Sequence, residues 1–474
     1  MLHSLKLNTL LHCMILLLAF LSSASTDPVA RAGMEDAGYN IFRRYIGGVV
    51  STWDILLFSL LFLLIYHSMS TAKTSNQLTL STRNNPIILY FLCLTLSVVV
   101  GLLVTVFTQV NSFIIRDWFR AVMPLIYLFC TYFIVVNIVN TNDKIYKIWL
   151  LMESIAIVMV IYGFYRLYGV LNGSIVTLTV SGIPIILYSE MIYFDLPIVV
   201  YILHAWCGKK LGLFRSLLLI CMVGFIFVST RRMNYILLLL NILLLLFIAR
   251  RSGIVTIKQA ILRSRYIILL FGMCSVVIII LVPGLLDGIW FAIQSINMYS
   301  SIGFEYTGEF RLIQIENIFL NMWNIPITFL SGFGIGTKWE VIKQLPITMD
   351  EIGSFMAYDA KTVVGGNDFL PYFHVPYFAT FFRFGIIGCF TLLYIVRILW
   401  INNAILIRSL PDKNMKLLLT AFTSLIMMPI LILGDSPTPV GYIMLGINLG
   451  LIESIRLSQL QQYTIMKKSQ NGFK

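Results

Sequence analysis

The chain has 474 residues, of which 59% are apolar and 12% charged, and its mean hydropathy is +0.89. Soluble globular domains contain about 45–50% apolar and about 25% charged residues, so this composition excludes a soluble globule and indicates an integral membrane protein. The net charge of +13 does not indicate nucleic-acid binding, because membrane topology and anionic headgroups explain Lys and Arg in the segments between apolar runs.

Apolar runs recur along the whole chain, and about 20 residues suffice for a helix to cross the hydrocarbon of a bilayer. Alternation typical of a transmembrane barrel is absent from the sequence, so the spans are predicted to be helices. We expect twelve of them, near residues 7–23, 53–69, 86–110, 121–141, 146–167, 191–206, 213–230, 234–249, 266–283, 375–400, 415–434 and 439–456. The expected fold class is an all-α polytopic membrane protein.

Lys and Arg predict the orientation, because positively charged segments stay in the cytoplasm. With the N-terminus inside, 21 of the 34 Lys and Arg residues are cytoplasmic, which leaves 13 outside. Both termini are then cytoplasmic, and the chain divides into spans one to nine (1–283), one large outer loop (284–374) and three spans with a cytoplasmic tail (375–474). An alternative for residues 1–24 is a cleaved signal peptide, since Ser22-Ser23-Ala24 offers small residues at a cleavage site.

The seven cysteines do not predict a disulfide framework, because six fall inside expected spans and Cys207 lies at the cytoplasmic end of one. No CxxC motif or His/Cys cluster indicates a metal site. We therefore expect neither a metal nor another cofactor.

Arginines on the outer side are the first candidates for a site. The loop 111–120 carries Arg116 and Arg120, and the short turn between the seventh and eighth spans carries Arg231 and Arg232. Arginines near hydrocarbon are costly and tend to pair or to mark a site. The alternative is that they snorkel to the interface and contact headgroup phosphates.

The large loop contains an amphipathic helix at 307–324, on which Arg311 begins a polar stripe. Gly332, Gly334 and Gly336 follow it. A Gly-x-Gly-x-Gly segment lets backbone N–H groups approach an anion closely, and a tight turn explains the glycines equally well. The strand and helix of a dinucleotide site and the lysine of a Walker motif are missing around them.

His374 lies where the large loop returns to the membrane, and it is the only one of the five histidines on the expected outer side. A histidine at the boundary between water and membrane is a candidate general base. The loop carboxylates Glu305, Glu309 and Asp368 are the alternatives.

In combination these motifs resemble the superfamily of O-antigen polymerases and O-antigen ligases of the bacterial envelope. The matching elements, in chain order, are Ser229-Thr230-Arg231-Arg232, Thr307-Gly308-Glu309-Phe310-Arg311, Gly332-x-Gly334-x-Gly336, and His374-x-x-Tyr377 followed by Gly385-Ile-Ile-Gly388. The resemblance covers about residues 210–400. Val375-Pro376 departs from the ligase-like pattern, which often has Asn after the histidine.

The resemblance implies a glycosyltransferase C-like fold in the bacterial inner membrane and metal-independent transfer from an undecaprenyl-diphosphate-linked glycan. His374 would remove a proton from the acceptor hydroxyl, with Arg311 beside it. Guanidinium groups bind phosphate oxygens and stabilise the negative charge that grows there during transfer. The resemblance therefore implies that the diphosphate leaving group is bound by Arg231, Arg232, Arg116, Arg120 and Arg383.

The expected function is polymerisation of lipid-linked oligosaccharide repeat units, of O-antigen or exopolysaccharide, at the periplasmic face. The partners would be the lipid-linked donor, an acceptor glycan, and a flippase and a chain-length regulator. One alternative is a ligase that transfers the glycan to lipid A core. Another is a transporter or flippase, although duplicated halves typical of transporters are not visible in the sequence.

Overall fold

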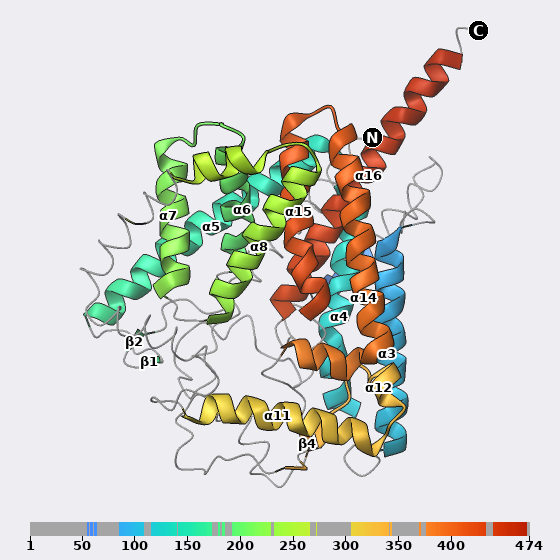
Figure 1. Cartoon of the computed structure of the whole chain (residues 1–474). Coiled ribbons are helices and arrows are strands. Elements are labelled where there is room, and N and C mark those ends of the chain that lie inside the picture. The colour runs from blue at the N-terminus through green and yellow to red at the C-terminus, as the bar shows by residue number, and fades with distance from the viewer. Residues whose placement is uncertain are drawn as a thin grey trace.

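The structure is a computed structural model of the whole chain (Figure 1). It describes residues 55, 57–59, 61–63, 85–108, 115–139, 141–172, 179–180, 183–184, 192–228, 232–265, 272, 305–340, 342–343, 369–370, 376–432 and 439–471.

Helices dominate the described residues. They are α3 (Pro86–Thr108), α4 (Ile115–Ile138), α5 (Asn142–Leu171), α6 (Ile192–Trp206), α7 (Leu213–Val228), α8 (Arg232–Arg251), α11 (Glu305–Asn324), α12 (Thr328–Ser331), α14 (Pro376–Ser409), α15 (Lys413–Ile432) and α16 (Pro439–Asn471). Residues 257–265 form a further short helix. Two antiparallel pairs of two-residue strands complete the set, β1 (Thr179–Val180) with β2 (Ile183–Pro184) and β3 (Trp339–Glu340) with β4 (Phe369–Leu370). The all-α fold class is confirmed for this part of the chain.

Within the described ranges, four helices are long and apolar enough to cross a membrane: 86–108, 142–169, 378–409 and 413–432. Shorter apolar helices cover 122–138, 193–206 and 213–226. The protein is therefore membrane-embedded. The expected spans 7–23, 53–69 and 266–283 lie outside the described residues, apart from a few positions, so the number twelve stays a prediction.

Helix ends differ from the expected spans where charged residues begin. α4 starts at Ile115, so Arg116 and Arg120 lie in its first turns, and their assignment to a loop was wrong. α14 and α16 likewise continue to Ser409 and Asn471, past the expected ends at 400 and 456. Hydropathy marks the lipid-facing part of a helix, but Leu, Gln, Arg and Lys are good helix formers in water and extend it.

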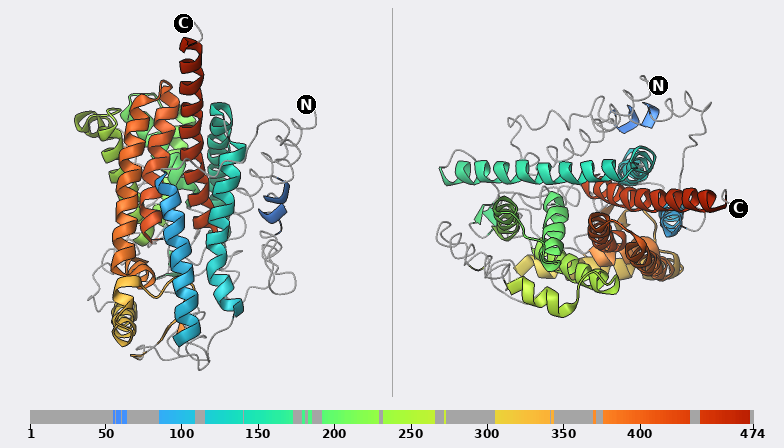
Figure 2. Two further views of the ribbon diagram at one scale, coloured as in Figure 1. Left: turned by 90° about the vertical axis from the view of Figure 1, so that its right-hand side faces the viewer. Right: turned by 90° about the horizontal axis from the view of Figure 1, so that it is seen from above.

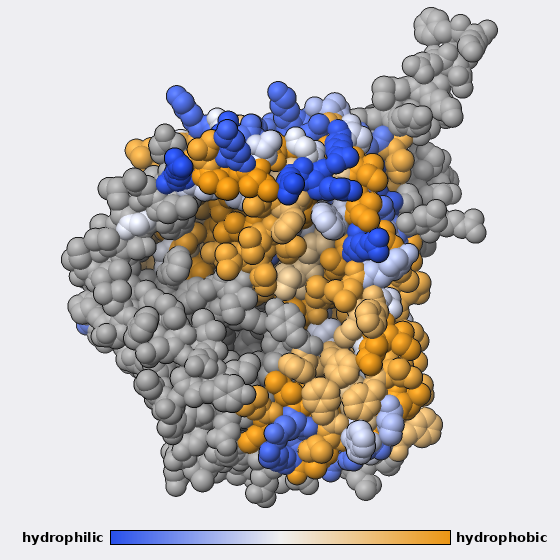
Figure 3. Space-filling view, in the orientation of Figure 1, coloured by the Kyte–Doolittle hydropathy of each residue, from blue (hydrophilic) through white to orange (hydrophobic). Residues whose placement is uncertain are grey.

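One end of the bundle gathers basic residues, and we call it the basic end. Arg408, near the end of α14, donates from Nε to the carbonyl oxygen of Arg251 at the end of α8, at 3.1 Å. Lys209, just after α6, donates to Asn414 Oδ1 in the first turn of α15, at 2.9 Å. Hydrophilic side chains accordingly line the upper edge in Figure 3. These are all residues expected in the cytoplasm, and they meet on one side as the positive-inside rule requires.

Two buried carboxylates inside the bundle, Glu153 and Glu453, are paired with arginine. Glu153 of α5 accepts hydrogen bonds from Arg215 Nε of α7 (2.7 Å) and from the Tyr201 hydroxyl of α6 (2.5 Å). Glu453 of α16 is bound by Arg456 on the same helix and by Asn85 Nδ2, at 2.5 Å, just before α3. Burying an unpaired charge costs several kcal/mol. The Glu153–Arg215 pair therefore joins α5 to α7, and the bond from Asn85 joins α16 to the start of α3.

Helices α4 and α16 pack closely because α16 presents glycines one turn apart. A Cβ atom added at Gly446 would lie 2.8 Å from the carbonyl oxygen of Leu128, and one at Gly450 would lie 2.7 Å from Val135 Cβ. Small residues at four-residue spacing let membrane helices approach in this way. Gly446-x-x-x-Gly450 is therefore the contact surface of this pair.

We expect Gly450→Leu to destabilise the protein, because its side chain has no space against α4. Overpacking a well-packed core costs about 1–3 kcal/mol, occasionally more. The apparent melting temperature of the purified protein in detergent measures this loss. Gly212→Leu is the matched control, since a Cβ atom at Gly212 meets nothing within 4 Å; equal melting temperatures for the two variants would contradict the prediction.

The opposite end of the bundle carries α11 and α12, and we call it the loop end. α11 runs across this end of the bundle in Figure 1, and it is seen nearly end-on in the left view of Figure 2. The expected helix at 307–324 is confirmed, with its start at Glu305. A second buried cluster, separate from the main core, joins α11 to the first part of α14 through Ile318, Met322, Ala379 and Phe382.

Candidate functional site

The segment 332–337, which we call the glycine loop, follows α12 and lies between α3 and the first part of α14. Three consecutive N–H groups donate to main-chain carbonyl oxygens: Phe333 to Phe382 (2.7 Å), Gly334 to Arg383 (2.9 Å) and Ile335 to Ser97 (3.0 Å). The loop therefore joins two helices by backbone hydrogen bonds, as a strand would. These N–H groups are occupied by the protein's own carbonyls.

The three glycines permit this close approach. Gly332, Gly334 and Gly336 have φ values of 74°, 81° and 92°, a region that side chains with a Cβ rarely adopt. An added Cβ atom would lie 2.4 Å from the Arg383 oxygen at Gly332, 2.0 Å from the Gly101 nitrogen at Gly334, and 2.7 Å from the Trp118 Nε1 at Gly336. Of the two alternatives, an anion cradle and a tight turn, these contacts support close backbone packing.

A kink in α14 provides the carbonyl groups. Gly385 interrupts the helix with φ 61° and ψ −170°. Because the helical hydrogen-bond pattern breaks there, the carbonyls of Phe382 and Arg383 are available to the glycine loop. Gly385 also faces Gly332 across the contact, since an added Cβ atom on it would lie 2.4 Å from the Gly332 nitrogen. The Gly385-Ile-Ile-Gly388 motif thus has a structural role at this contact.

Arg383 is buried beside the glycine loop, with 2% of its surface exposed. Its Nη1 donates to the carbonyl oxygen of Gly334 at 3.3 Å and to that of Thr337. Its guanidinium carbon lies 5.3 Å from the centroid of the Phe382 ring. Arg383 therefore binds backbone carbonyls of the glycine loop. That it also contacts a diphosphate stays a prediction.

The glycine loop lies well inside the length of α3. Ser97 and Gly101 are 11 and 7 residues before the end of that helix, which corresponds to about 16 and about 10 Å at 1.5 Å per residue. Non-helical backbone at such a depth is tolerated in membranes only where protein covers it. The buried state of residues 332–337 meets that condition.

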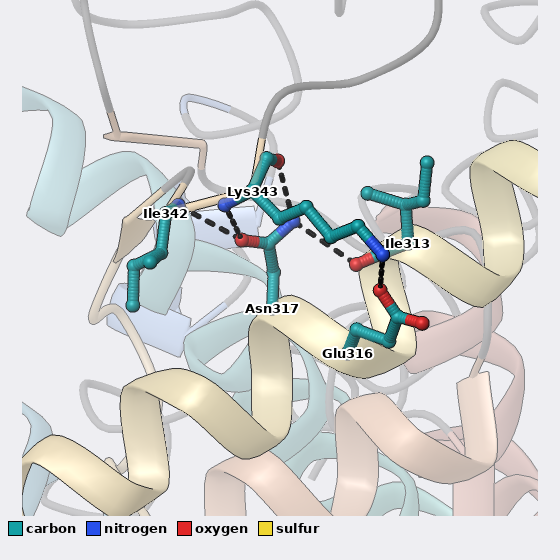
Figure 4. Close-up of polar contacts among 5 residues, drawn as sticks. All are labelled: Ile313, Glu316, Asn317, Ile342 and Lys343. Carbon is teal, nitrogen blue, oxygen red and sulfur yellow. Dashed lines mark hydrogen bonds and ion pairs between the residues drawn. The ribbon is translucent and has the colours of Figure 1, made fainter.

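On α11, Asn317 acts as a clamp for the chain that leaves the glycine loop (Figure 4). Its Oδ1 accepts the N–H groups of Ile342 and Lys343, each at 2.8 Å, and its Nδ2 donates to the Lys343 carbonyl at 3.0 Å. Asn321, one turn later, exchanges two hydrogen bonds with the backbone of Glu340. The two amides hold the backbone at 340 and at 342–343 against α11, next to the pairing of β3 with β4.

We expect Asn317→Ala to loosen this junction, because it leaves two N–H groups and a carbonyl without their partner. An unsatisfied buried polar group costs about 1–3 kcal/mol. Limited proteolysis of the purified protein should cut faster between 341 and 368 than in the wild type. Asn324→Ala is the control, since Asn324 lies exposed on the same helix. Equal cleavage of the two variants would show that the clamp does not order the loop.

The large loop returns through β4, whose Phe369 pairs with Glu340 of β3. Only five residues separate β4 from the start of α14 at Pro376, and His374 is one of them. His374 itself lies outside the described residues. The two described elements nearest to it in sequence have partners, because β4 pairs with β3 and α14 bonds the glycine loop.

The predicted arginines begin helices at the loop end. Arg116 and Arg120 lie in the first turns of α4, Arg232 begins α8, and Arg311 lies in the first half of α11. The structure describes their backbone positions and not their side chains, and Arg231 lies outside the described residues. In Figure 1 the starts of α4 and α8 both lie on the side of the bundle on which α11 lies.

Two further residues were not identified as candidates from the sequence. Trp118, on α4, faces Gly336, and its buried indole N–H has no hydrogen-bond partner among the described residues. Arg166 is buried in the last part of α5, with its guanidinium 5.9 Å from the Tyr162 ring. An arginine near the outer end of the expected span 146–167 is a signal that the sequence did contain. In the described part of the chain, no three His, Cys, Asp or Glu residues gather as metal ligands.

A comparison with protein-family models finds no match, and comparisons with curated proteins and with solved structures find none either. The geometry therefore carries the functional argument. It consists of a buried arginine, an interlocked glycine loop and several arginine-bearing helix starts at one end of a membrane-embedded bundle. Such an end is suited to a membrane-bound anion and a polar co-substrate.

Proposed function

We propose that the protein polymerises lipid-linked oligosaccharide repeat units, of O-antigen or exopolysaccharide, at the periplasmic face of the bacterial inner membrane. The donor is a glycan on undecaprenyl diphosphate, and the acceptor is a sugar hydroxyl of a second glycan. In this proposal the loop end faces the periplasm and the basic end faces the cytoplasm. A flippase and a chain-length regulator are the proposed partners.

The reaction forms a bond between the acceptor oxygen and the anomeric carbon while the bond to the diphosphate breaks. In the proposed mechanism His374 takes the proton of the attacking hydroxyl. Arg311 and the arginines at 116, 120, 231, 232 and 383 bind the diphosphate, whose negative charge grows in the transition state. The transfer is proposed to be metal-independent.

The observation that carries the proposal is the convergence of arginine-bearing segments on the loop end. The starts of α4 and α8, the first half of α11 and the first part of α14 come from distant parts of the sequence. Arginines in membrane proteins are costly unless paired or functional. Of these segments, α4 and α14 contact the glycine loop, and a lipid diphosphate is an anion that such arginines bind.

A transporter of a lipid-linked glycan would use the same arginines to guide its substrate. The loop end argues for an enzyme, because the clamp and the glycine loop hold its backbone by many hydrogen bonds at one face of the bundle. A fixed site on one side suits positioned chemistry. Alternating access instead moves one half of a transporter against the other.

The polymerase and the ligase differ in their acceptor, so the glycans of a deletion strain separate them. We expect lipid A core capped with a single repeat unit when the gene is removed. Full-length lipid-linked chains that never reach lipid A would identify a ligase instead. Complementation with the wild-type gene is the control, and a deletion strain with unchanged glycans would contradict both enzyme assignments.

A further inference from the structure

The exposed side of α11 carries large apolar side chains, unlike that of a helix on a water-soluble surface. Its amide side chains Asn317 and Asn321 are buried, whereas Phe319, Leu320 and Trp323 are exposed, the last to 74%. A helix that faces water shows polar residues outside and apolar residues inside. The buried side of α11 thus combines amides with the apolar residues Ile318 and Met322, while its exposed side carries large apolar residues.

The exposed face continues into α12. Phe319, Leu320, Trp323, Ile327 and Leu330 are all exposed, and we call them the apolar ridge. No charged residue is among them. Contiguous exposed apolar surface on this scale marks a membrane or a protein interaction site.

The apolar ridge adjoins surfaces that face lipid. α12 packs against α14, where Ile386 and Ile387 are exposed just after the kink. The ring of Phe319 lies 6.1 Å from that of Phe381 at the start of α14. Figure 3 shows apolar surface running from the bundle down to this region, with hydrophilic side chains only at the lower edge.

The level of α11 along the bundle agrees with this continuity. α11 lies beside the C-terminal end of α3 in Figure 1, and at the same level in the left view of Figure 2. That end of α3 exposes Leu103, Val106 and Phe107, the last to 78%, on a helix long and apolar enough to span a membrane. Phe107 and α11 thus lie at the same level along the bundle. Lipid that contacts Phe107 is therefore also level with α11.

We propose that the apolar ridge is seated in the lipid leaflet at the loop end, so that α11 lies along the membrane surface. Trp323 then occupies the boundary between acyl chains and headgroups, which tryptophan favours. The ion pair of Lys343 with Glu316, both half exposed, lies on the water side. The inference goes beyond the proposed function and holds whether or not the protein is an enzyme.

Lipid, and not a protein partner, is the occupant because the ridge adjoins the exposed apolar residues of α14 and lies level with those of α3. A protein interface usually has a polar rim around its apolar core. The exposed polar residues that border the ridge along the chain are Glu316, Asn324 and Ser331, of which only Glu316 is charged. Such a sparsely charged border suits the interface between acyl chains and headgroups.

Fluorescence quenching in proteoliposomes of phosphatidylethanolamine and phosphatidylglycerol, containing only the purified protein, tests the inference. A Trp323→Cys variant is labelled with an environment-sensitive fluorophore, and Lys343→Cys is the control on the same substructure. Lipids with a nitroxide on the acyl chain should quench the label at 323 several-fold more than the label at 343. Aqueous iodide should show the reverse order. Unsubstituted protein, labelled in parallel, corrects for the native cysteines.

An Ile327→Cys variant repeats the test if the label at 323 disturbs folding. Quenching of both ridge positions by iodide would place the ridge in water and overturn the inference. Ridge labels that neither quencher reaches would also overturn it, because protein, such as a second copy of the chain, would then cover the ridge. Transfer activity is not measured, so failure of the proposed function leaves this result unaffected.

Discussion

The Gly334→Ala variant is expected to lose the folded state, although it adds a single methyl group. The new Cβ atom would lie 2.0 Å from the nitrogen and 2.4 Å from the Cα of Gly101, and 2.4 Å from the Ser97 carbonyl oxygen. All three are backbone atoms of α3, which cannot rotate away as a side chain can. The φ of +81° adds strain of about 1–2 kcal/mol for a residue with a Cβ. Overpacking adds about 1–3 kcal/mol or more.

Thermal unfolding of the purified protein, followed by size-exclusion chromatography, measures this effect. Gly253→Ala is a closely matched control, because Gly253 has a φ of +73° and an added Cβ atom there meets nothing within 4 Å. The control therefore carries the backbone strain without the collision. If both variants melt at the same temperature, the collision with α3 is absent and the described position of the glycine loop is wrong.

The helices could be predicted from the sequence because each is a long apolar run bounded by charged or helix-breaking residues. The expected spans 191–206 and 415–434 match α6 and α15 within two residues at each end. Both are flanked by such boundaries. Ends inside charged stretches, as at the start of α4, could not be predicted, since hydropathy falls there while the helix continues.

The partners of the site residues could not be predicted, because they are distant in sequence. Gly334 meets Gly101 of α3, and its N–H bonds the carbonyl of Arg383 on α14. The local pattern predicts only that the glycines form a turn or an anion cradle, and the contacts with α3 and α14 distinguish the two. The orientation of α11 was equally open, because amphipathicity defines two faces and not which of them meets lipid.

In a transfer assay with purified protein and an undecaprenyl-diphosphate-linked repeat unit, His374→Ala is expected to lose about 10²–10⁴-fold in turnover, the usual contribution of a positioned general base. The prediction rests on the proposed function. The five residues between β4 and α14 include this histidine; β4 pairs with β3, and α14 is hydrogen-bonded to the glycine loop. Melting temperature should stay near the wild-type value, because the change removes a proton acceptor and no described contact.

The pH dependence of turnover separates a base from a merely structural histidine. A base must be neutral to accept a proton, so wild-type turnover should rise as pH passes through about 6.5, the ordinary pKa of histidine, and level off above it. His374→Ala should lack this rise as well as most of its rate. His204→Ala, on α6 near the basic end, makes the same chemical change away from the loop end and should keep the wild-type profile. If His374→Ala retains near-normal turnover with an unchanged pH profile, the base is another group, and Glu305, Glu309 and Asp368 are the next residues to substitute.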